Sequence, residues 1–201
     1  MREEMIYRGA EAELYKSKYM DMPAVMKKRL PKAYRIREID ERIRSERIKT
    51  ETGMIREARS AVSTPYVFDI NMPQKILTMA YIQGKKLRDL FYEGQDITQL
   101  SEKAGQNVAK LHAKDIIHGD LTTSNMIYHD GEIYFIDFGL ALKSKKDEDK
   151  AMDIKVFRDM LKSTHYKHFD EIWPAFQKGY KNQRILRKVQ DIEKRARYVE
   201  R

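Results

Sequence analysis

The first third of the chain alternates between hydrophobic and polar positions, and this period of two predicts β-strands. Five stretches alternate in this way or run apolar between turn residues. They are the two sides of Gly9 in MIYRGAEAELYKSKYM, the stretch PAVMKKRL, and the pair YVFDI and KILTMAYI, which NMPQ separates. The stretch REIDERIRSERIKTETGMIREARSAV has a helical pattern, in which Gly53 could interrupt the helix.

After Gly84 the hydrophobic period lengthens and predicts helices. In the stretch DITQLSEKAGQNVAKLHAK, four apolar residues share one helical face: Leu100, Ala104, Val108 and Leu111. The stretch MIYHDGEIYFI predicts a β-hairpin, because Asp130-Gly131 is a turn dipeptide between two apolar runs. Three more helical patterns follow: DKAMDIKVFRDMLKS, FDEIWPAFQKGY and RILRKVQDIEKRARYV.

These elements predict an α+β fold with two lobes. We expect a strand-rich N-lobe over residues 1–81 and a helical C-lobe over residues 82–201, with a hinge at residues 80–84. Because ligand sites are usually concave and often lie between domains, we expect a binding cleft between the lobes.

The composition narrows the classes of protein. The chain has no cysteine, which excludes a disulfide framework and a zinc-thiolate site. No apolar run approaches the roughly 20 residues of a membrane span. We therefore expect no membrane partner and a cytoplasmic location. The net charge of +9, from 40 basic and 31 acidic residues, favours a polyanionic partner or an acidic protein surface.

The positive charge gathers near the C-terminus. From Lys178 to Arg201 nine Lys or Arg residues stand against three Asp or Glu residues. This pattern fits a surface that contacts a nucleic acid or an acidic protein surface, and Lys194, Arg195 and Arg197 are the candidate contacts. A solvated helix face explains the same pattern, so both interpretations stay open.

Three polar side chains lie in the span HGDLTTSNMIYHDGEIYFIDFG, around the predicted hairpin. Asn125 precedes the first strand and Asp137 follows the second, so the two side chains can face each other. Their oxygens suit Mg²⁺, which keeps several waters and bridges to phosphate oxygens. Asp120, in the preceding loop, can approach a hydroxyl group or water. The set predicts phosphoryl transfer, which depends mainly on positioning and charge neutralisation.

The segments HGDLTTSN and IDFG resemble the catalytic and metal-binding loops of the protein-kinase superfamily. The resemblance implies that ATP and Mg²⁺ are bound. It assigns Asp120 as the base or the residue that orients the nucleophile, and Asn125 and Asp137 as metal ligands.

The same resemblance implies a phosphate-binding lysine on the third strand, paired with a glutamate of the next helix. In AVMKKR, Lys27 fits the strand alternation, whereas Lys28 points to the opposite face and is expected to be exposed. The segment IREARSA supplies Glu57 as the expected partner of Lys27. An ordinary surface lysine and glutamate are the alternative.

Five segments, RGAEA, VMKKRLPKAYR, IREAR, HGDLTTSN and DFGLA, together resemble the small atypical kinase subunits of the KEOPS complex, the bud-site-selection kinase family. The resemblance implies an ATP-hydrolysing or Ser/Thr-phosphorylating subunit of a complex that makes threonylcarbamoyladenosine on transfer RNA. The implied partners are a threonylcarbamoyltransferase subunit, a small subunit on the N-lobe, and transfer RNA, directly or through the complex.

The sequence departs from ordinary protein kinases at the phosphate loop. Only Gly9 lies in RGAEAE, where a kinase has three glycines. We expect residues 9–13 to cover the phosphates, with Glu11 or Glu13 near the metal or the Lys27 ammonium. Ala80 and Ile82, at the hinge, are the other expected ATP contacts.

Two further departures concern regulation. His118-Gly119 precedes Asp120, so the usual arginine is missing, and no Ala-Pro-Glu follows Asp137. Switching by phosphorylation of an activation segment is therefore not expected. Within the closer family, Ala33 and Ala196 stand where glycine is usual, and the second of these departures concerns the role of the tail.

Five other polar residues carry expectations. Asp153 is expected to hydrogen-bond the catalytic-loop backbone from behind. His112 and His118 are expected to pack and hydrogen-bond beside that loop. His165 and His168 have the helical spacing of a metal-chelating pair, but no third ligand is apparent, so an exposed pair is expected instead.

Two functions remain open at this stage. The chain is either an Mg-ATP-dependent kinase or ATPase, or mainly a scaffold and RNA-binding module with vestigial activity. The complete polar set favours the enzyme, since a scaffold need not retain it.

Overall fold

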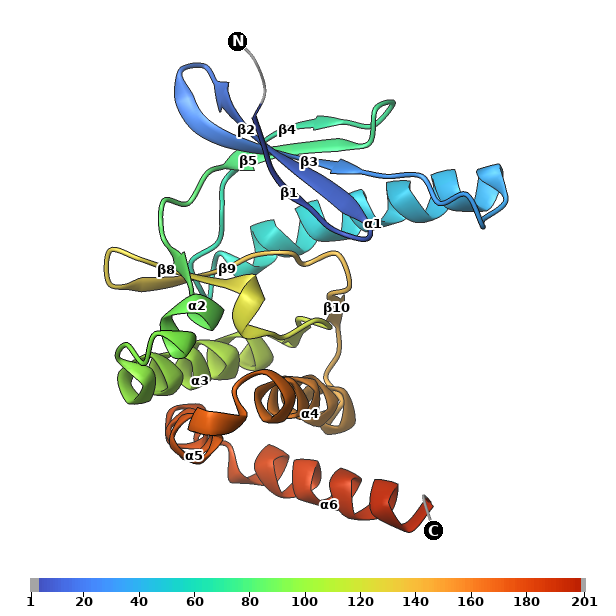
Figure 1. Cartoon of the computed structure of the whole chain (residues 1–201). Helices are drawn as coiled ribbons and strands as arrows, with labels where there is room; N and C mark the ends of the chain where they lie inside the picture. The colour runs from blue at the N-terminus through green and yellow to red at the C-terminus, as the bar shows by residue number, and fades with distance from the viewer. Residues whose placement is uncertain (1–3, 200–201) are drawn as a thin grey trace.

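The computed structural model describes residues 4–199, with side chains described through residue 195. It has a mixed α+β fold with a strand-rich lobe above a helical lobe (Figure 1). This confirms the expected fold class. The boundary after residue 81 stays a prediction.

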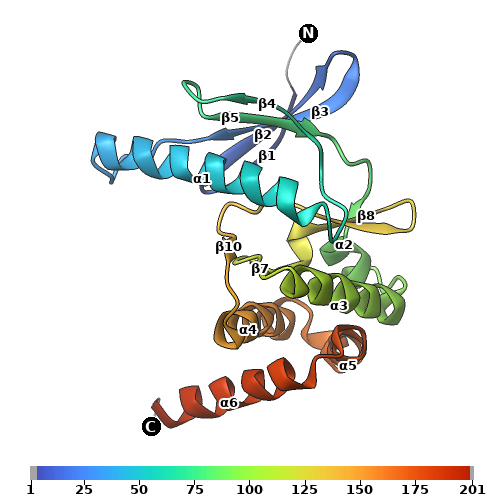
Figure 2. The same ribbon diagram turned by 180° about the vertical axis from the view of Figure 1, so that it is seen from behind.

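The upper lobe is a five-stranded antiparallel sheet in the order β1-β2-β3-β5-β4. Its strands are β1 (Glu4–Arg8), β2 (Ala12–Tyr19), β3 (Met22–Arg29), β4 (Val67–Asn71) and β5 (Ile76–Ala80). Helix α1 (Arg37–Ala58) runs along one face of this sheet (Figure 2). All the strands predicted in this region are present, so the period-two pattern identified them correctly.

Helix α1 continues through Gly53, so the expected break there is wrong. A Cβ at Gly53 would meet no atom within 4 Å. The glycine therefore costs about 1 kcal/mol of helix propensity relative to alanine. Burial of Ile48 and Ile55 against the sheet outweighs that cost, since neither side chain is exposed.

The lower lobe contains most of the helices. They are α2 (Leu87–Tyr92), α3 (Ile97–Ala113), α4 (Asp147–Thr164), α5 (Phe169–Tyr180), α6 (Gln183–Val199) and the 3₁₀ turns η1 (Thr123–Asn125) and η2 (Tyr166–His168). Short strands complete it: β6 (Lys85–Lys86), β7 (Ile116–Ile117), β8 (Met126–His129), β9 (Glu132–Phe135) and β10 (Leu142–Lys143). Within residues 4–199, no helix combines the length and the apolar character needed to span a membrane.

Strands β8 and β9 form the predicted hairpin, with Met126 opposite Phe135 and His129 opposite Glu132. Asp130 and Gly131 both have positive φ, as a two-residue turn of this kind requires. Met126, Ile133 and Phe135 are fully buried. The hairpin is thus anchored in the core and carries its flanking polar residues to the cleft.

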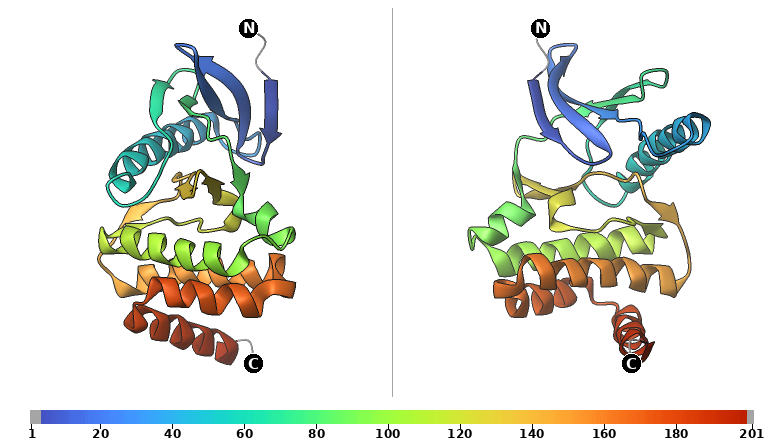
Figure 3. Two further views of the ribbon diagram at one scale, coloured as in Figure 1. Left: turned by 90° about the vertical axis from the view of Figure 1, so that its left-hand side faces the viewer. Right: turned by 45° about the vertical axis from the view of Figure 1, so that its right-hand side comes forward.

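The helices below the hairpin stack in layers, with α6 at the base (Figure 3). The predicted apolar face of α3 is buried, and its members are Leu100, Ala104, Val108 and Leu111. Helices α3 and α5 approach closely at two glycines. A Cβ at Gly105 would overlap the Phe176 carbonyl, and one at Gly179 would overlap the Glu102 carbonyl.

Candidate active site

A cavity of about 740 Å³ lies between the sheet and the hairpin region. Most of the residues predicted for the site line it: Gly9, Glu11, Lys27, Ala80, Ile82, Asp120, Asn125 and Asp137. The volume falls in the range of small-molecule and cofactor sites. The structure thus brings residues that are as far apart in the sequence as Gly9 and Asp137 to one cleft.

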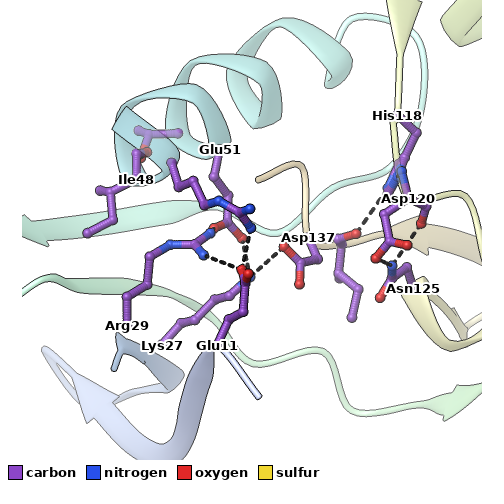
Figure 4. Close-up of polar contacts among 12 residues, drawn as sticks. Glu11, Lys27, Arg29, Ile48, Glu51, His118, Asp120, Asn125 and Asp137 are labelled. Carbon is purple, nitrogen blue, oxygen red and sulfur yellow. Dashed lines mark hydrogen bonds and ion pairs between the residues drawn. The ribbon is translucent and has the colours of Figure 1, made fainter. Parts of the chain in front are cut away.

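Lys27 stands at the centre of the upper wall. It lies on β3, and its Nζ is 2.8 Å from Glu51 Oε1 and 2.6 Å from Asp137 Oδ1 (Figure 4). The Lys27 side chain is only 7% exposed, and Glu51 is not exposed at all. The ammonium is thus fixed between a helix carboxylate and the carboxylate that follows β9. Lys28 is exposed, as expected from the alternation.

Glu51, rather than Glu57, is the partner of Lys27, so the predicted Lys27–Glu57 pair is wrong. Glu57 pairs with Lys143 at 2.6 Å, and both side chains are about half exposed. Six residues at 3.6 per turn place Glu57 on a different side of α1 from Glu51. The helical spacing in the sequence distinguishes the two glutamates, because Glu51 lies on the same side of α1 as the buried Ile48 and Ile55.

Asp137 holds an unusual backbone conformation, with φ of 62°. Burial alone would raise the pKa of its carboxyl, but the charge and hydrogen bond of Lys27 outweigh burial and hold the pKa below its ordinary value. Asp137 is therefore an anion at neutral pH. An anionic oxygen ligand is what a magnesium site requires.

Asn125 and Asp120 are joined directly. The Asn125 side-chain amide donates to the Asp120 backbone carbonyl and to Asp120 Oδ2, both at 2.9 Å. These two bonds use the amide nitrogen, which leaves the Asn125 Oδ1 oxygen for a metal and Asp120 Oδ1 for a nucleophile. Figure 4 shows the pair on the far side of Asp137 from Lys27.

Asp153 supports the catalytic loop from below, as expected. Its carboxylate accepts from the backbone N–H groups of His118 at 3.0 Å and Gly119 at 2.9 Å, and lies 3.1 Å from His112 Nε2. Burial raises the pKa of Asp153, but the His112 hydrogen bond leads the opposing interactions and the pKa stays below its ordinary value. The expected packing roles of His112 and His118 are confirmed, since both rings are buried and bonded.

His165 is buried, so its expected exposure is wrong. Its Nε2 lies 2.9 Å from Thr123 Oγ1, in the catalytic loop. The ring packs against Phe91 and Tyr92 of α2, because η2 turns it inward. In the described part of the chain no group of three or more Asp, Glu, His or Cys residues could hold a metal, so no metal site forms around His165 there.

The set that faces the cleft fits magnesium better than zinc. Asn125 and Asp137 offer oxygen atoms, and none of the described residues that line the cleft is a histidine or a cysteine. Two protein ligands suffice for Mg²⁺, since phosphate oxygens and waters complete its octahedron.

The loop of residues 9–13, expected to cover the phosphates, is held by charge rather than by glycine. The Glu11 carboxylate pairs with Arg47, its backbone carbonyl accepts from Leu30 N at 3.0 Å, and the Gly9 N–H donates to Ala12 O at 2.9 Å. Glu13 pairs with Arg8 at 3.3 Å. Among the described residues no ion pair joins either glutamate to Lys27, and the expectation that one of them lies near the metal or the Lys27 ammonium stays a prediction. Arg29 and Arg47 line the cleft as well, although no motif in the sequence indicated them.

The C-terminal candidates lie on α6, far below the cleft. Lys194 is exposed, and Arg195 Nη1 lies 3.8 Å from Glu148 Oε1 with a side chain that is 69% exposed. The side chain of Arg197 lies outside the described residues. The segment after the metal-binding motif is short, because α4 begins at Asp147.

Comparison with known proteins agrees with this geometry. The RIO domain family matches residues 13–172. The chain is 38% identical over 213 residues to the KEOPS complex subunit Bud32 of Pyrococcus abyssi, covering 98% of this chain and 97% of that protein.

Longer relatives also match. Identity is 42% over 204 residues to the probable bifunctional tRNA threonylcarbamoyladenosine biosynthesis protein of Methanocaldococcus jannaschii, and 41% over 202 residues to that of Methanobrevibacter smithii. The alignments cover 98% and 97% of this chain, but the chain spans 37% of each of these relatives. By its fold, its cleft residues and its full-length match to Bud32, the chain belongs to the RIO-domain family and, within it, to the Bud32 family.

Proposed function

We propose that this chain binds Mg-ATP in the cleft and transfers the γ-phosphoryl group to water or to a Ser or Thr hydroxyl. We further propose that it acts as a subunit of a KEOPS-type complex that makes threonylcarbamoyladenosine on transfer RNA. One observation carries the catalytic part of the proposal. Lys27, Asp120, Asn125 and Asp137 line the same cavity of about 740 Å³.

Each of these residues has a role that its contacts support. Lys27, already oriented by Glu51 and Asp137, presents an ammonium to the α- and β-phosphates. Asn125 Oδ1 and the Asp137 carboxylate would hold Mg²⁺. When bound, Mg²⁺ supplies neutralisation of the phosphate charge. Asp120, held through Oδ2 by Asn125, accepts the proton of a hydroxyl or orients a water with its other oxygen.

The remaining ATP contacts follow from the lining of the cleft. Ala80 and Ile82, at the hinge, would contact the adenine, while Gly9 and Glu11 would cover the phosphates from above. Because the loop has a single glycine, its position depends on the ion pairs of Glu11. This supports a loop that is held in place before nucleotide binds.

The partners and the location are proposed from the names of the relatives and from the charge. We propose a threonylcarbamoyltransferase partner, a small subunit on the N-lobe, and a cytoplasmic location. The exposed Lys194 and Arg195, with Arg197 beyond the described side chains, would contact transfer RNA or the partner enzyme. Contacts to RNA phosphates would make that binding steeply salt-dependent.

The exposed basic face of α6 also supports a second candidate function. In this alternative the chain is mainly a scaffold or RNA-binding module with vestigial phosphoryl transfer. Asp120→Ala separates the two functions, because it removes the proposed base and leaves α6 unchanged. If the chain is an enzyme, Asp120→Ala should lower the rate of phosphate release roughly 100-fold or more and leave complex assembly intact, because loss of a general base usually has an effect of this size.

The measurement is ATP turnover with and without the threonylcarbamoyltransferase partner and transfer RNA. Release of phosphate without labelled protein assigns water as the acceptor, and labelled Ser or Thr assigns a protein hydroxyl. Asp159→Ala, at an exposed site of α4, is the matched control and should keep turnover within about twofold. Equal turnover of wild type and Asp120→Ala would favour the scaffold.

A further inference from the structure

Arg29 is buried beside Lys27 on the upper wall of the cleft. The two residues are two apart on β3, so both point to the same face of the sheet. The Arg29 side chain is 3% exposed, and its Nη2 lies 2.5 Å from Glu51 Oε2. Lys27 binds the other oxygen, Oε1, of the same carboxylate. Strand β3 therefore holds both oxygens of one helix glutamate (Figure 4).

The same guanidinium reaches two other parts of the site. Its Nη1 lies 3.9 Å from Glu11 Oε2, in the loop proposed to cover the phosphates. On the opposite side it packs against Gly139, two residues after Asp137. A Cβ at Gly139 would lie 2.6 Å from Arg29 Nη2, so a larger residue there would push against the guanidinium.

We propose that Arg29 is a positioning residue for phosphoryl transfer, which ties α1, the phosphate loop and the metal-binding segment to β3; this rests on the proposed function above. It acts through Glu51 and Glu11 and does not touch the reacting atoms. With both oxygens of Glu51 held from β3, α1 cannot move outward without breaking two buried ion pairs. The Lys27–Glu51 pair thus stays assembled without an activation segment.

The chemistry of arginine suits this role. A guanidinium has several hydrogen-bond donors in a fixed plane and can bind two carboxylates at once, whereas an ammonium group is a compact point charge. The charges also balance once Arg47, the partner of Glu11, is included. The three cations are Lys27, Arg29 and Arg47, and they face three carboxylates, those of the buried Glu51 and the half-exposed Glu11 and Asp137. Buried charges are tolerated only when they are paired in this way.

The test compares Arg29→Ala and Arg29→Lys with Lys28→Met. Lys28 is the adjacent residue, it is exposed on the opposite face, and its substitution removes the same charge. We expect Arg29→Ala to lower kcat/KM for ATP at least tenfold and to speed amide exchange at least fivefold in residues 9–12 and 48–55. Lys28→Met should match the wild type in both measurements.

Arg29→Lys keeps the positive charge but can keep only one of the two carboxylate contacts. It therefore separates the contact with Glu51 of α1 from the contact with Glu11. We expect it to retain slow exchange in residues 48–55, with faster exchange in residues 9–12 and a KM for ATP raised at least threefold. Guanidinium chloride at low millimolar concentration should raise the turnover of Arg29→Ala at least threefold.

The proposal is overturned if both Arg29 variants match Lys28→Met in turnover and in exchange. Should Arg29→Ala not fold, Arg29→Lys decides alone, through the exchange of residues 9–12. The exchange measurement needs no turnover, so it also separates this proposal from the proposed function. A wild type that hydrolyses no ATP would refute the function, whereas unchanged exchange in the Arg29 variants would refute the role of Arg29.

Discussion

The two walls of the cleft hold their functional groups in different ways. On the upper wall Lys27, Arg29 and Glu51 fix one another through buried ion pairs that join residues 22 and 24 positions apart. On the lower wall Asp120 and Asn125 lie five residues apart, and their loop is held by backbone hydrogen bonds to a single buried carboxylate, Asp153. The upper wall depends on how α1 meets the sheet, while the lower wall depends on one helix side chain beneath a loop.

This difference predicts different failures. Loss of a charge on the upper wall leaves its buried partners unbalanced and should affect catalysis most directly. Loss of Asp153 on the lower wall leaves two backbone N–H groups without their acceptor and should affect stability most directly. Three experiments test this contrast.

Asp153→Ala should have the largest effect on stability. It removes the acceptor of the His118 and Gly119 N–H groups and the partner of His112, so we expect a loss of about 3–5 kcal/mol in the free energy of unfolding. Urea denaturation measures it. Asp159→Ala on the same helix, in an exposed pair with Lys155, should cost less than about 1 kcal/mol.

The same pair of variants carries a pH dependence. The folded-state pKa of Asp153 lies below the ordinary value of 3.8, so its contribution to stability is present above that pH and is lost as the pH falls through the lower folded value. The wild type should therefore lose more stability on acidification below about pH 4 than Asp153→Ala does. Parallel curves for the two proteins would contradict the role of Asp153.

Glu51→Gln should have the next largest effect, mainly on turnover. It leaves the cations of Lys27 and Arg29 facing a neutral amide, so we expect about a 100-fold loss of kcat/KM, equivalent to roughly 2.7 kcal/mol. Glu57→Gln is the matched control. Its pair with Lys143 is half exposed, and turnover should stay within about twofold. A greater loss in Glu57→Gln than in Glu51→Gln would reverse the assignment.

His165 should give the smallest effect, which appears in the pH dependence of stability. Burial, with the charges of His168 and Arg88, lowers its pKa to about 4 from 6.5. Between these values the unfolded chain binds the proton and the folded chain does not, so stability falls as the pH drops through this window. Relative to His165→Gln, the wild type should lose roughly 1–2 kcal/mol more between pH 7 and pH 4.

The control for this measurement is His168→Gln, which keeps the buried ring and removes one nearby charge. Its loss of stability on acidification should fall between those of the wild type and His165→Gln. Thermal unfolding followed at several pH values measures all three proteins. An identical loss of stability at acidic pH in all three proteins would show that the Thr123–His165 contact does not depend on the neutral imidazole ring.

The lower wall could be predicted from the sequence because its information is local. Asp120, Asn125 and Asp137 stand within one short span, and the hairpin between them follows from Asp130-Gly131 and two apolar runs. The contact from Asp153 was also predicted, although it comes from α4. There the resemblance to kinases supplied what local pattern could not.

The upper wall was harder to predict, because it depends on the rotation of α1 about its axis. Glu51 and Glu57 are both acidic and lie in one helix, and only the buried stripe distinguishes them. The role of Arg29 needed the same information, since its partner is Glu51. His165 was misjudged for a related reason, because its burial depends on where α2 places Phe91 and Tyr92.

The glycine contacts between α3 and α5 limit how this lobe can vary. Gly105 and Gly179 each face a carbonyl of the opposite helix, so even an alanine at either position would force the two backbones apart. Redesign of the proposed nucleotide site should therefore leave this helix pair unchanged and concentrate on residues that line the cleft, such as Ala80 and Ile82.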